Sequence, residues 1–222
     1  MKLIFTILII LFFIYIIMSI LEIIFKKRNN TFDTYFGVPG SGKTTLAAYL
    51  AKKRLKKKKD VYSNVSIKGC YNINKSDIGH YDMSHGLILC DEAGVEFNNR
   101  NYAKNFDYEQ IEFLKHHRHY DNDLAFFSQY WNDIDVTLRR LSTRLFLLKK
   151  SLIPFFIKRK KIGKRIGIDE TTKQIIDEYY FVPFIFGNKY IFSPALWKMF
   201  DTHEKTKLPI KKFEIYGKGE EE

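Results

Sequence analysis

The residues best suited to chemistry form one glycine-rich segment, Gly37–Thr44, between a β-prone stretch at 31–36 and a helical pattern. Its spacing, G-x-x-x-x-G-K-T, is typical of a phosphate-binding loop, although glycine-rich turns of purely structural role are the alternative. Glycines let backbone N–H groups point at phosphate oxygens, Lys43 supplies a cation for the β- and γ-phosphates, and the Thr44 hydroxyl can ligate Mg²⁺. The N-terminal end of the following helix favours the same anion. The predicted nucleotide contacts are Gly37, Val38, Pro39, Gly40, Ser41, Gly42, Lys43, Thr44 and Thr45.

A pair of carboxylates, Asp91 and Glu92, directly follows the apolar run Leu87–Cys90. Such a run predicts a buried central strand, and open α/β sheets bind ligands at the carboxyl ends of their strands. With the loop upstream, the pair looks like a Walker B motif. Asp91 would then lie near Mg²⁺, and Glu92 would orient and deprotonate the attacking water. A strand that merely ends in a polar turn is the alternative.

Gln129 and three arginines are candidates for contact with the reacting phosphate. Gln129 follows the next apolar run and could bond the γ-phosphate or the lytic water, or it could simply cap the strand. Arg139, Arg140 and Arg144 belong to the segment 134–145, which we expect to reach an edge of the domain. An arginine supplied across a subunit interface would stabilise transition-state charge, although most surface arginines have no such role.

Two further clusters leave their chemistry open. His116, His117 and His119 are metal-ligand types, but consecutive histidines on a helix point in different directions, so a polar helix end is the preferred interpretation. A basic cluster around Phe155 and Phe156 is compatible with nucleic-acid contact, with a solvated β-hairpin and with a membrane-surface patch. Its cations are Lys149, Lys150, Lys158, Arg159, Lys160, Lys161, Lys164 and Arg165.

The segments between these motifs predict alternating strands and helices. The predicted strands occupy residues 31–36, 61–67, 87–90, 124–127 and 144–148, with a polar loop at 72–79. The predicted helices occupy residues 46–55 and 106–117. Strands that alternate with helices indicate an α/β fold, a mainly parallel sheet with crossover helices, as in P-loop NTPases.

The length of 222 residues suits one such domain with an attachment. We assign residues 1–28 to a membrane anchor, 29–205 to the P-loop domain and 206–222 to a charged tail. Two cysteines exclude a disulfide framework and read as reduced cytosolic thiols. The formal charge of +12 favours an anionic partner, either nucleic acid or the inner leaflet of a membrane.

The attachment is an uncharged stretch of 19 residues, Leu3–Leu21. A helix rises about 1.5 Å per residue, so this stretch nearly spans a hydrocarbon core of about 30 Å. A signal peptide is the alternative, but the run is longer than usual and has no small-residue cleavage pattern. The cations at 26–28 place the rest of the chain in the cytoplasm by the positive-inside rule.

Taken together, these motifs resemble the Zot family, the zonular-occludens-toxin-like and filamentous-phage assembly ATPases of the FtsK-HerA branch of P-loop proteins. The matching stretches are 36–45, 61–65, 87–92, 117–119 with Asp123, 126–129, 133–135 leading to 138–139, and 197–204. Members usually place their membrane span after the ATPase domain, whereas the apolar run comes first here. The resemblance implies that ATP and Mg²⁺ are the cofactors, that Gln129 is a sensor and that Arg139 is the arginine finger.

The resemblance also implies a function in the host inner membrane. Proteins similar to these use ATP to drive phage assembly and extrusion. The resemblance implies that the chain acts with coat or assembly proteins as a homo-oligomer, with a hexameric ring as the expected form. One alternative is an ATPase that translocates double-stranded viral DNA. Another is a nucleotide-gated scaffold that binds ATP without hydrolysing it.

Overall fold

The computed structural model describes residues 6, 9–17, 30–96, 107–168, 175–183 and 187–200. Residues 9–17 are helical and mostly exposed. The expected membrane span at 3–21 and the two expected domain boundaries lie partly or wholly outside the described ranges. Within those ranges, no helix combines the length and the apolar content that crossing a bilayer requires.

The elements up to residue 150 largely follow the alternation of strands and helices that the sequence predicts, and those after it are mainly strands. In chain order they are β1 (Phe32–Phe36), α2 (Lys43–Leu55), β2 (Val61–Ser63), β3 (Tyr71–Asn72), η1 (Lys75–Asp77), β4 (Leu87–Cys90), α3 (Ala93–Glu96), α5 (Tyr108–His116), β5 (Asp123–Ser128), η3 (Trp131–Asp133), α6 (Val136–Leu141), β6 (Arg144–Lys150), β7 (Phe156–Ile168), β8 (Ile175–Phe181), β9 (Asn188–Phe192) and η4 (Pro194–Met199).

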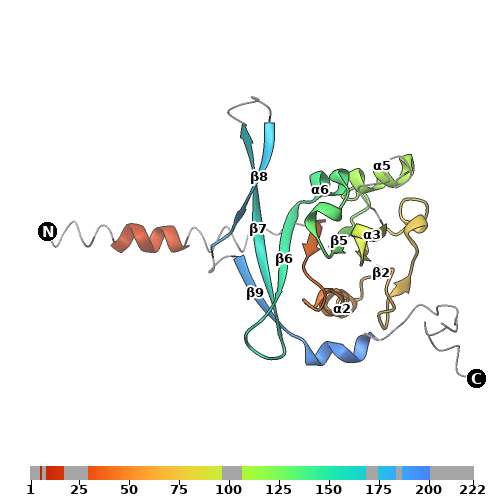
Figure 1. Ribbon diagram of the computed structural model, residues 1–222, viewed down its shortest axis with the longest axis horizontal. Helices are drawn as coiled ribbons and strands as arrows, with labels where there is room; N and C mark the ends of the chain where they lie inside the picture. Colours follow the sequence, from red (N-terminus) through yellow and green to blue (C-terminus); the bar gives the residue numbers. More distant parts are fainter. Residues whose placement is uncertain are drawn as a thin grey trace, which may run out of the picture.

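The strands of the described residues form one mixed sheet in the order β3-β2-β4-β5-β1-β6-β7-β8, with β9 paired to β7 (Figure 1). The pairs from β3 to β6 are parallel, as predicted. The pairs of β7 with β6, β8 and β9 are antiparallel. Because the strands on both sides of β1 run parallel to it, their carboxyl ends meet beside the glycine-rich loop.

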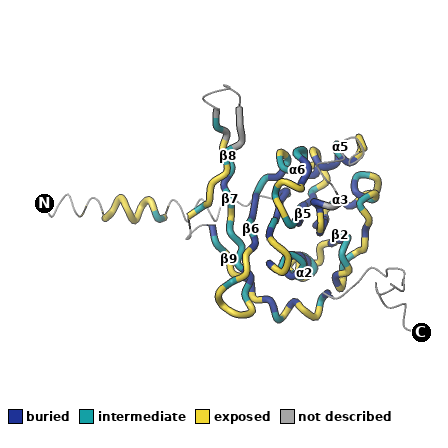
Figure 2. Tube along the Cα trace, in the orientation of Figure 1, coloured by how far each residue is buried: buried dark blue, intermediate teal, exposed yellow. Residues whose placement is uncertain are grey.

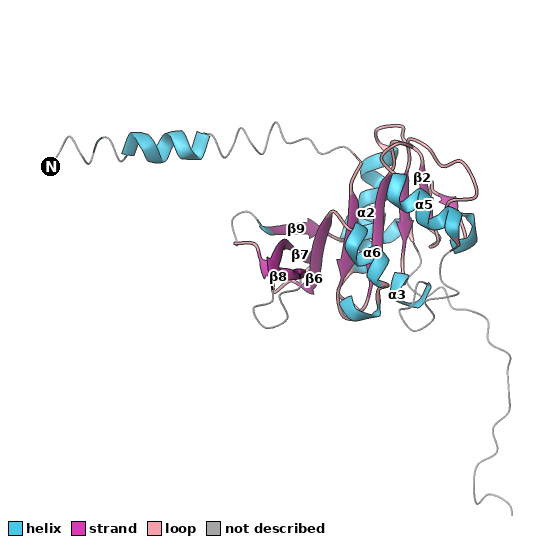
Figure 3. Ribbon diagram, turned by 90° about the horizontal axis from the view of Figure 1, so that it is seen from above, coloured by secondary structure: helices cyan, strands magenta, loops and turns pink. Residues whose placement is uncertain are grey.

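Alternating side chains of the sheet build a core on each face. Tyr35 and Phe127 face α2, whereas Phe32 and Phe126 face α5 and α6. Figure 3 shows α2 on one side of the strands and α6 on the other. The helices are therefore the expected crossover connections, which bury one apolar stripe each against the sheet.

Three of the predicted segments differ in the structure, and the strands β8 and β9 lie where the sequence analysis predicted no strand. The strand expected at 61–67 ends at Ser63, because Asn64 turns its side chain to the main chain of Asp91. The helix expected at 106–117 begins at Tyr108, because the Asp107 carboxylate caps it by accepting from the Gln110 N–H. The loop expected at 72–79 contains the short helix η1 and the end of β3.

The basic cluster lies on the antiparallel hairpin of β6 and β7. Its conformation is therefore the β-hairpin that was one of the three interpretations of its sequence. Exposed residues follow β8 and the turn between β6 and β7, while buried residues concentrate around β1 and β5 (Figure 2). The antiparallel hairpin extends the sheet beyond the parallel core that carries the loop.

His117 predicts a pH dependence of stability. It is buried at the end of α5, its Nδ1 lies 2.9 Å from the Leu114 carbonyl oxygen, and its Nε2 has no hydrogen-bond partner among the described residues. Burial lowers the pKa of the imidazole below its ordinary 6.5. The unfolded state therefore takes up a proton first, so stability present above pH 6.5 is lost as the pH falls toward the lower, folded pKa.

We expect the free energy of unfolding, measured with urea, to fall between pH 7.5 and pH 5.5. His117→Asn, which keeps a donor to the Leu114 carbonyl, should flatten this slope, and His116→Gln on the exposed face of the same turn should not. An equal slope in wild type and His117→Asn would contradict the assignment.

Candidate functional site

The glycine-rich loop joins the end of β1 to the start of α2. Gly40 and Gly42 have φ of 72° and 92°, left-handed values that side chains disfavour. A side chain at Gly37 would meet the Leu148 carbonyl oxygen at 2.6 Å. The loop therefore needs its glycines for curvature and for close packing, as the motif predicts.

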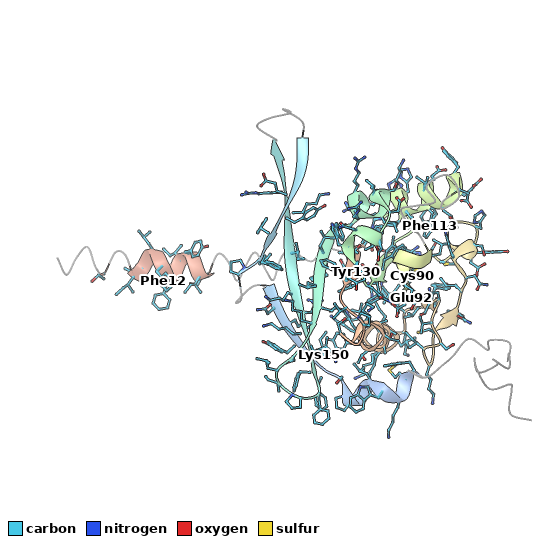
Figure 4. The ribbon with its side chains drawn as sticks, viewed as in Figure 1. Phe12, Cys90, Glu92, Phe113, Tyr130 and Lys150 are labelled. Carbon is cyan, nitrogen blue, oxygen red and sulfur yellow. The ribbon has the colours of Figure 1, made fainter. Side chains whose placement is uncertain are left out.

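The acidic pair lies against this loop. The Thr44 hydroxyl donates to a carboxylate oxygen of Asp91 at 3.0 Å, although the two residues are 47 positions apart in the sequence. Asp91 is buried at the carboxyl end of β4, and Glu92 follows it at the surface. Figure 4 shows Glu92 beside Cys90, the last residue of that strand. The structure thus brings together the two motifs that the sequence placed separately.

Lys43 adds a positive charge beside the two carboxylates of Asp91 and Glu92. Its ammonium donates to the carbonyl oxygens of Gly37 and Val38, at 2.9 and 3.4 Å. Burial lowers the pKa of Lys43, whereas the negative charges of Asp91 and Glu92 act in the opposite direction. One cation and two carboxylates therefore share the space at the mouth of the loop.

Asn64 is a further residue of the site, not predicted from the sequence, and it positions Asp91. Its amide donates to the Asp91 carbonyl at 2.9 Å and accepts from the Asp91 N–H at 2.7 Å. This pair of bonds ties the end of β2 to the end of β4. The signal was available, since Asn64 is a polar residue at the carboxyl end of a neighbouring strand.

Glu92 has a left-handed backbone, with φ of 54°. This conformation costs a non-glycine residue about 1 kcal/mol and recurs at functional sites. The Glu92 N–H donates to the Asp91 carboxylate at 2.9 Å, which holds the turn in place. The strained turn therefore places the exposed Glu92 directly after the carboxyl end of β4.

We expect Glu92→Gly to raise the free energy of unfolding by about 1 kcal/mol, because glycine adopts this backbone without strain. Lys58→Gly is the matched control, since Lys58 has the same φ of 54° and lies away from the site in the turn after α2. Urea unfolding measures both. Stabilisation by Lys58→Gly alone would mean that contacts of the Glu92 side chain offset its strain.

Gln129 lies directly after the carboxyl end of β5, at the edge of the sheet that carries the glycine-rich loop. It follows Ser128, whose carbonyl oxygen accepts from the Gly37 N–H at 3.2 Å. The residue is half-buried beside the first glycine of the loop. Its position is compatible with a contact to a bound phosphate, and its role as a sensor stays a prediction.

The structure places two of the three arginines in different surroundings: Trp131, beside Arg139, packs on Phe36 at the end of β1, whereas Arg144 lies near the start of that strand. Arg139 lies on α6, where its guanidinium carbon is 5.7 Å from the centroid of the Trp131 ring. Arg144 donates to Asp33 near the start of β1, away from the loop. Leu138 packs α6 onto the sheet, and Arg140 on the same helix is exposed, so the expectation that this segment reaches an edge of the domain stays a prediction. Action of Arg139 on a neighbouring subunit stays a prediction.

The histidine cluster gives no metal site among the described residues. His116 and His119 pack edge to face at 5.1 Å, while His117 is buried toward Leu114. The group of metal-ligand types that does lie together in the described part is His80, Asp107 and Glu109, all exposed. The polar helix end is therefore the better description of residues 116–119.

The residues at the loop fit a phosphate group. Helix α2 begins without a side-chain cap and without an acidic residue in its first turn, so its first N–H groups lack an internal partner. The Ser41 hydroxyl is buried and has no hydrogen-bond partner among the described residues. An anion at this position would satisfy these donors, and Thr44 with Asp91 offers the oxygen ligands that Mg²⁺ prefers.

A family model described as "Zonular occludens toxin (Zot)" matches residues 50–172, more than half of the chain. The matched stretch begins within α2, after the glycine-rich loop, and includes Asp91, Glu92, Gln129 and Arg139. A comparison with proteins of curated function gave no match.

Solved structures of similar fold include the N-terminal domain of zonular occludens toxin from Neisseria meningitidis. It is 15% identical over 78% of this chain and 100% of that one, with a TM-score of 0.48. Another is the genome packaging NTPase B204 from Sulfolobus turreted icosahedral virus 2 in complex with ATP-gammaS. It is 12% identical over 69% of this chain and 98% of that one, with a TM-score of 0.46.

Proposed function

Because the family model spans more than half of its length, this chain belongs to the zonular occludens toxin (Zot) family, and from this premise we propose that it is a membrane-anchored ATPase. It drives the assembly or extrusion of filamentous virions, or the export of their DNA. The observation that carries the proposal is the 3.0 Å hydrogen bond between Thr44 and Asp91, beside Lys43.

The residues of the site divide the work of phosphoryl transfer. Lys43 and the loop N–H groups would hold the phosphates, and Thr44 and Asp91 would hold Mg²⁺. Glu92 accepts a proton from the attacking water, and Gln129 orients that water. When bound there, Mg²⁺ would supply positive charge against the charge that develops on the phosphate oxygens.

The test of this activity is phosphate release from ATP by the full chain in detergent. Release that requires Mg²⁺ supports the ATPase. Tight ATP binding without release would select the nucleotide-gated scaffold instead.

The anchor and its location are part of the proposal. The uncharged stretch 3–21 and the cations at 26–28 support a single span in the host inner membrane, with the domain in the cytoplasm. Removal of residues 1–28 should move the protein from the membrane fraction to the soluble fraction of the cell. A truncated chain that stays with the membrane would contradict the assignment.

The surface formed by β7, β8 and β9 favours single-stranded nucleic acid as the transported polymer. Lys158 lies over the Tyr190 ring at 5.6 Å, and Lys160 over the Phe181 ring at 5.2 Å. The strand pairing places these four side chains on one face of the sheet, and both rings are partly exposed. Cations that track a backbone, interleaved with rings on which bases stack, are typical of single-strand binding.

Stimulation of ATP turnover distinguishes the polymers. We expect single-stranded DNA to stimulate the wild type, and the pair Lys158→Glu and Lys160→Glu to abolish this effect. The pair Lys56→Glu and Lys57→Glu, at the far end of α2, makes the same charge change and should retain it. Stimulation by duplex DNA alone would favour the packaging alternative, and stimulation by coat protein alone would favour extrusion without DNA contact.

The oligomeric state is also proposed rather than observed. Arginine action in trans requires a second copy, and Arg139 is the residue that we assign to it. Particle images of the detergent-solubilised protein would show whether it forms a ring and whether that ring has six subunits.

A further inference from the structure

A cavity of about 370 Å³ adjoins the glycine-rich loop. Gly40, Ser41, Gly42 and Thr45 line one wall, and the β6–β7 turn with η4 lines the other. The volume is within the range of small-molecule sites. The cavity therefore shares the backbone of the loop but belongs to a different part of its surface from the acidic pair.

The cavity and the acidic pair lie on opposite sides of the loop. In the sheet order, β4, which carries Asp91, lies on one side of β1, and β6 and β7 lie on the other. Glu92 and Lys150, both labelled in Figure 4, fall on opposite sides of α2 in that view. Thr44 contacts Asp91, whereas the next residue, Thr45, lines the cavity.

Two aromatic side chains form the outer wall of the cavity. The rings of Phe155 and Trp197 are 6.1 Å apart and inclined by 57°. They are 59% and 52% exposed, which leaves aromatic surface open beside the loop. Such surface marks a binding site when it borders a cavity with polar groups.

The position of Phe155 is fixed by its backbone. Its φ is 64°, a left-handed value that costs a bulky residue free energy. The N–H and the hydroxyl of Ser193 both donate to the Phe155 carbonyl oxygen, at 2.8 and 2.6 Å. The two hydrogen bonds hold Phe155 in this strained backbone conformation and so fix its ring at the cavity.

A cation borders the same cavity. The Lys150 ammonium lies 3.7 Å from the point where a side chain at Gly40 would begin. Lys150 ends β6, which runs parallel to β1, so its position follows from the sheet. The cavity therefore combines a cation next to the loop with aromatic surface farther out.

We propose that this cavity binds the nucleoside part of a nucleoside triphosphate, an assignment that rests on the proposed function. A triphosphate that lies along the loop has its metal-bound end at Thr44 and Asp91, so its nucleoside end extends toward Thr45 and the cavity. The base stacks on Phe155 and Trp197, and Lys150 attracts the phosphate nearest the ribose. Aromatic side chains stack on the face of any base, so these two rings would bind a base without distinguishing its hydrogen-bonding edge.

Affinities of the full chain for ATP and for inorganic tripolyphosphate test this proposal. Phe155→Ala should weaken ATP binding about tenfold, the effect of losing one stacked base contact, and leave tripolyphosphate binding within twofold. Tyr130→Ala removes an exposed ring that does not line the cavity and should change neither. Equal loss for both ligands in Phe155→Ala, or loss for neither, would overturn the proposal.

Tryptophan fluorescence provides a second measurement that does not depend on truncating the wall. The chain has two tryptophans, so Trp131→Phe leaves Trp197 as the only one. ATP should quench Trp197 emission saturably, and tripolyphosphate should not. ATP that binds without changing this emission would overturn the nucleoside site alone, whereas failure of both ligands to bind would overturn the proposed function with it.

Discussion

Glu92→Gln is expected to reduce ATP turnover by 100-fold or more while leaving ATP affinity nearly unchanged. The amide keeps the size of the side chain but cannot accept a proton from the attacking water, and general bases contribute about 10²–10⁴ to the rate. Glu92 lies at the surface directly after buried Asp91, in a turn whose backbone is held by the Asp91 carboxylate. A single-turnover assay of phosphate release, alongside ATP titration, measures both quantities.

Glu112→Gln is the matched control for this experiment. Glu112 is exposed on α5 and should tolerate the same substitution without effect on turnover. Turnover that survives Glu92→Gln would remove the general base from the proposed mechanism. Loss of ATP affinity in step with turnover would instead assign Glu92 to binding.

Asp33→Ala is expected to lower the free energy of unfolding by about 3 kcal/mol. The buried Asp33 carboxylate accepts from the Arg144 guanidinium, at 2.7 Å from its Nε, and from the Tyr35 hydroxyl at 3.1 Å. Burial opposes the charged form of Arg144, but the hydrogen bonds and the charge of Asp33 outweigh it and raise the pKa of the guanidinium. Removal of the carboxylate leaves a partly buried cation without its counter-charge, with only the Thr31 hydroxyl among the described residues still accepting from it at 2.9 Å, so the loss exceeds that of a surface pair.

The pair of Arg165 and Glu178 supplies the control. The Arg165 Nε and a Glu178 carboxylate oxygen are 2.6 Å apart across the pairing of β7 with β8, and the Arg165 side chain is 70% exposed. Glu178→Ala should change the free energy of unfolding by less than about 1 kcal/mol. Urea unfolding in detergent measures both variants, and equal effects would show that Asp33 does not anchor β1 to β6.

The sequence was sufficient to predict the loop and the acidic pair because each is a contiguous motif at the end of a strand. The order of strands and crossovers followed from hydrophobic periodicity, which β1, α2, β4 and β5 obey. Proximity of Thr44 to Asp91 was then a consequence of parallel strands that end at one edge.

Side-chain partnerships between distant segments could not be predicted in the same way. Arg144 was a finger candidate, yet its register opposite Asp33 commits it to an ion pair. Asn64 was assigned to a longer strand; its polar side chain indicated the carboxyl edge of the sheet, but its partner there, Asp91, follows from the pairing of β2 with β4. The wall formed by Phe155 and Trp197 depends on how the hairpin and η4 return to the loop, and neither segment reveals this alone.

The most direct test asks whether Thr44 and Asp91 hold one Mg²⁺ ion together with ATP. ATP is titrated calorimetrically with and without Mg²⁺ into the wild type, Thr44→Ala, Asp91→Asn and the double variant. We predict that Mg²⁺ strengthens ATP binding to the wild type, that each single variant loses most of this gain, and that the double variant loses no more, because both side chains act on one ion. A gain from Mg²⁺ that survives Asp91→Asn, or losses that simply add, would contradict the account.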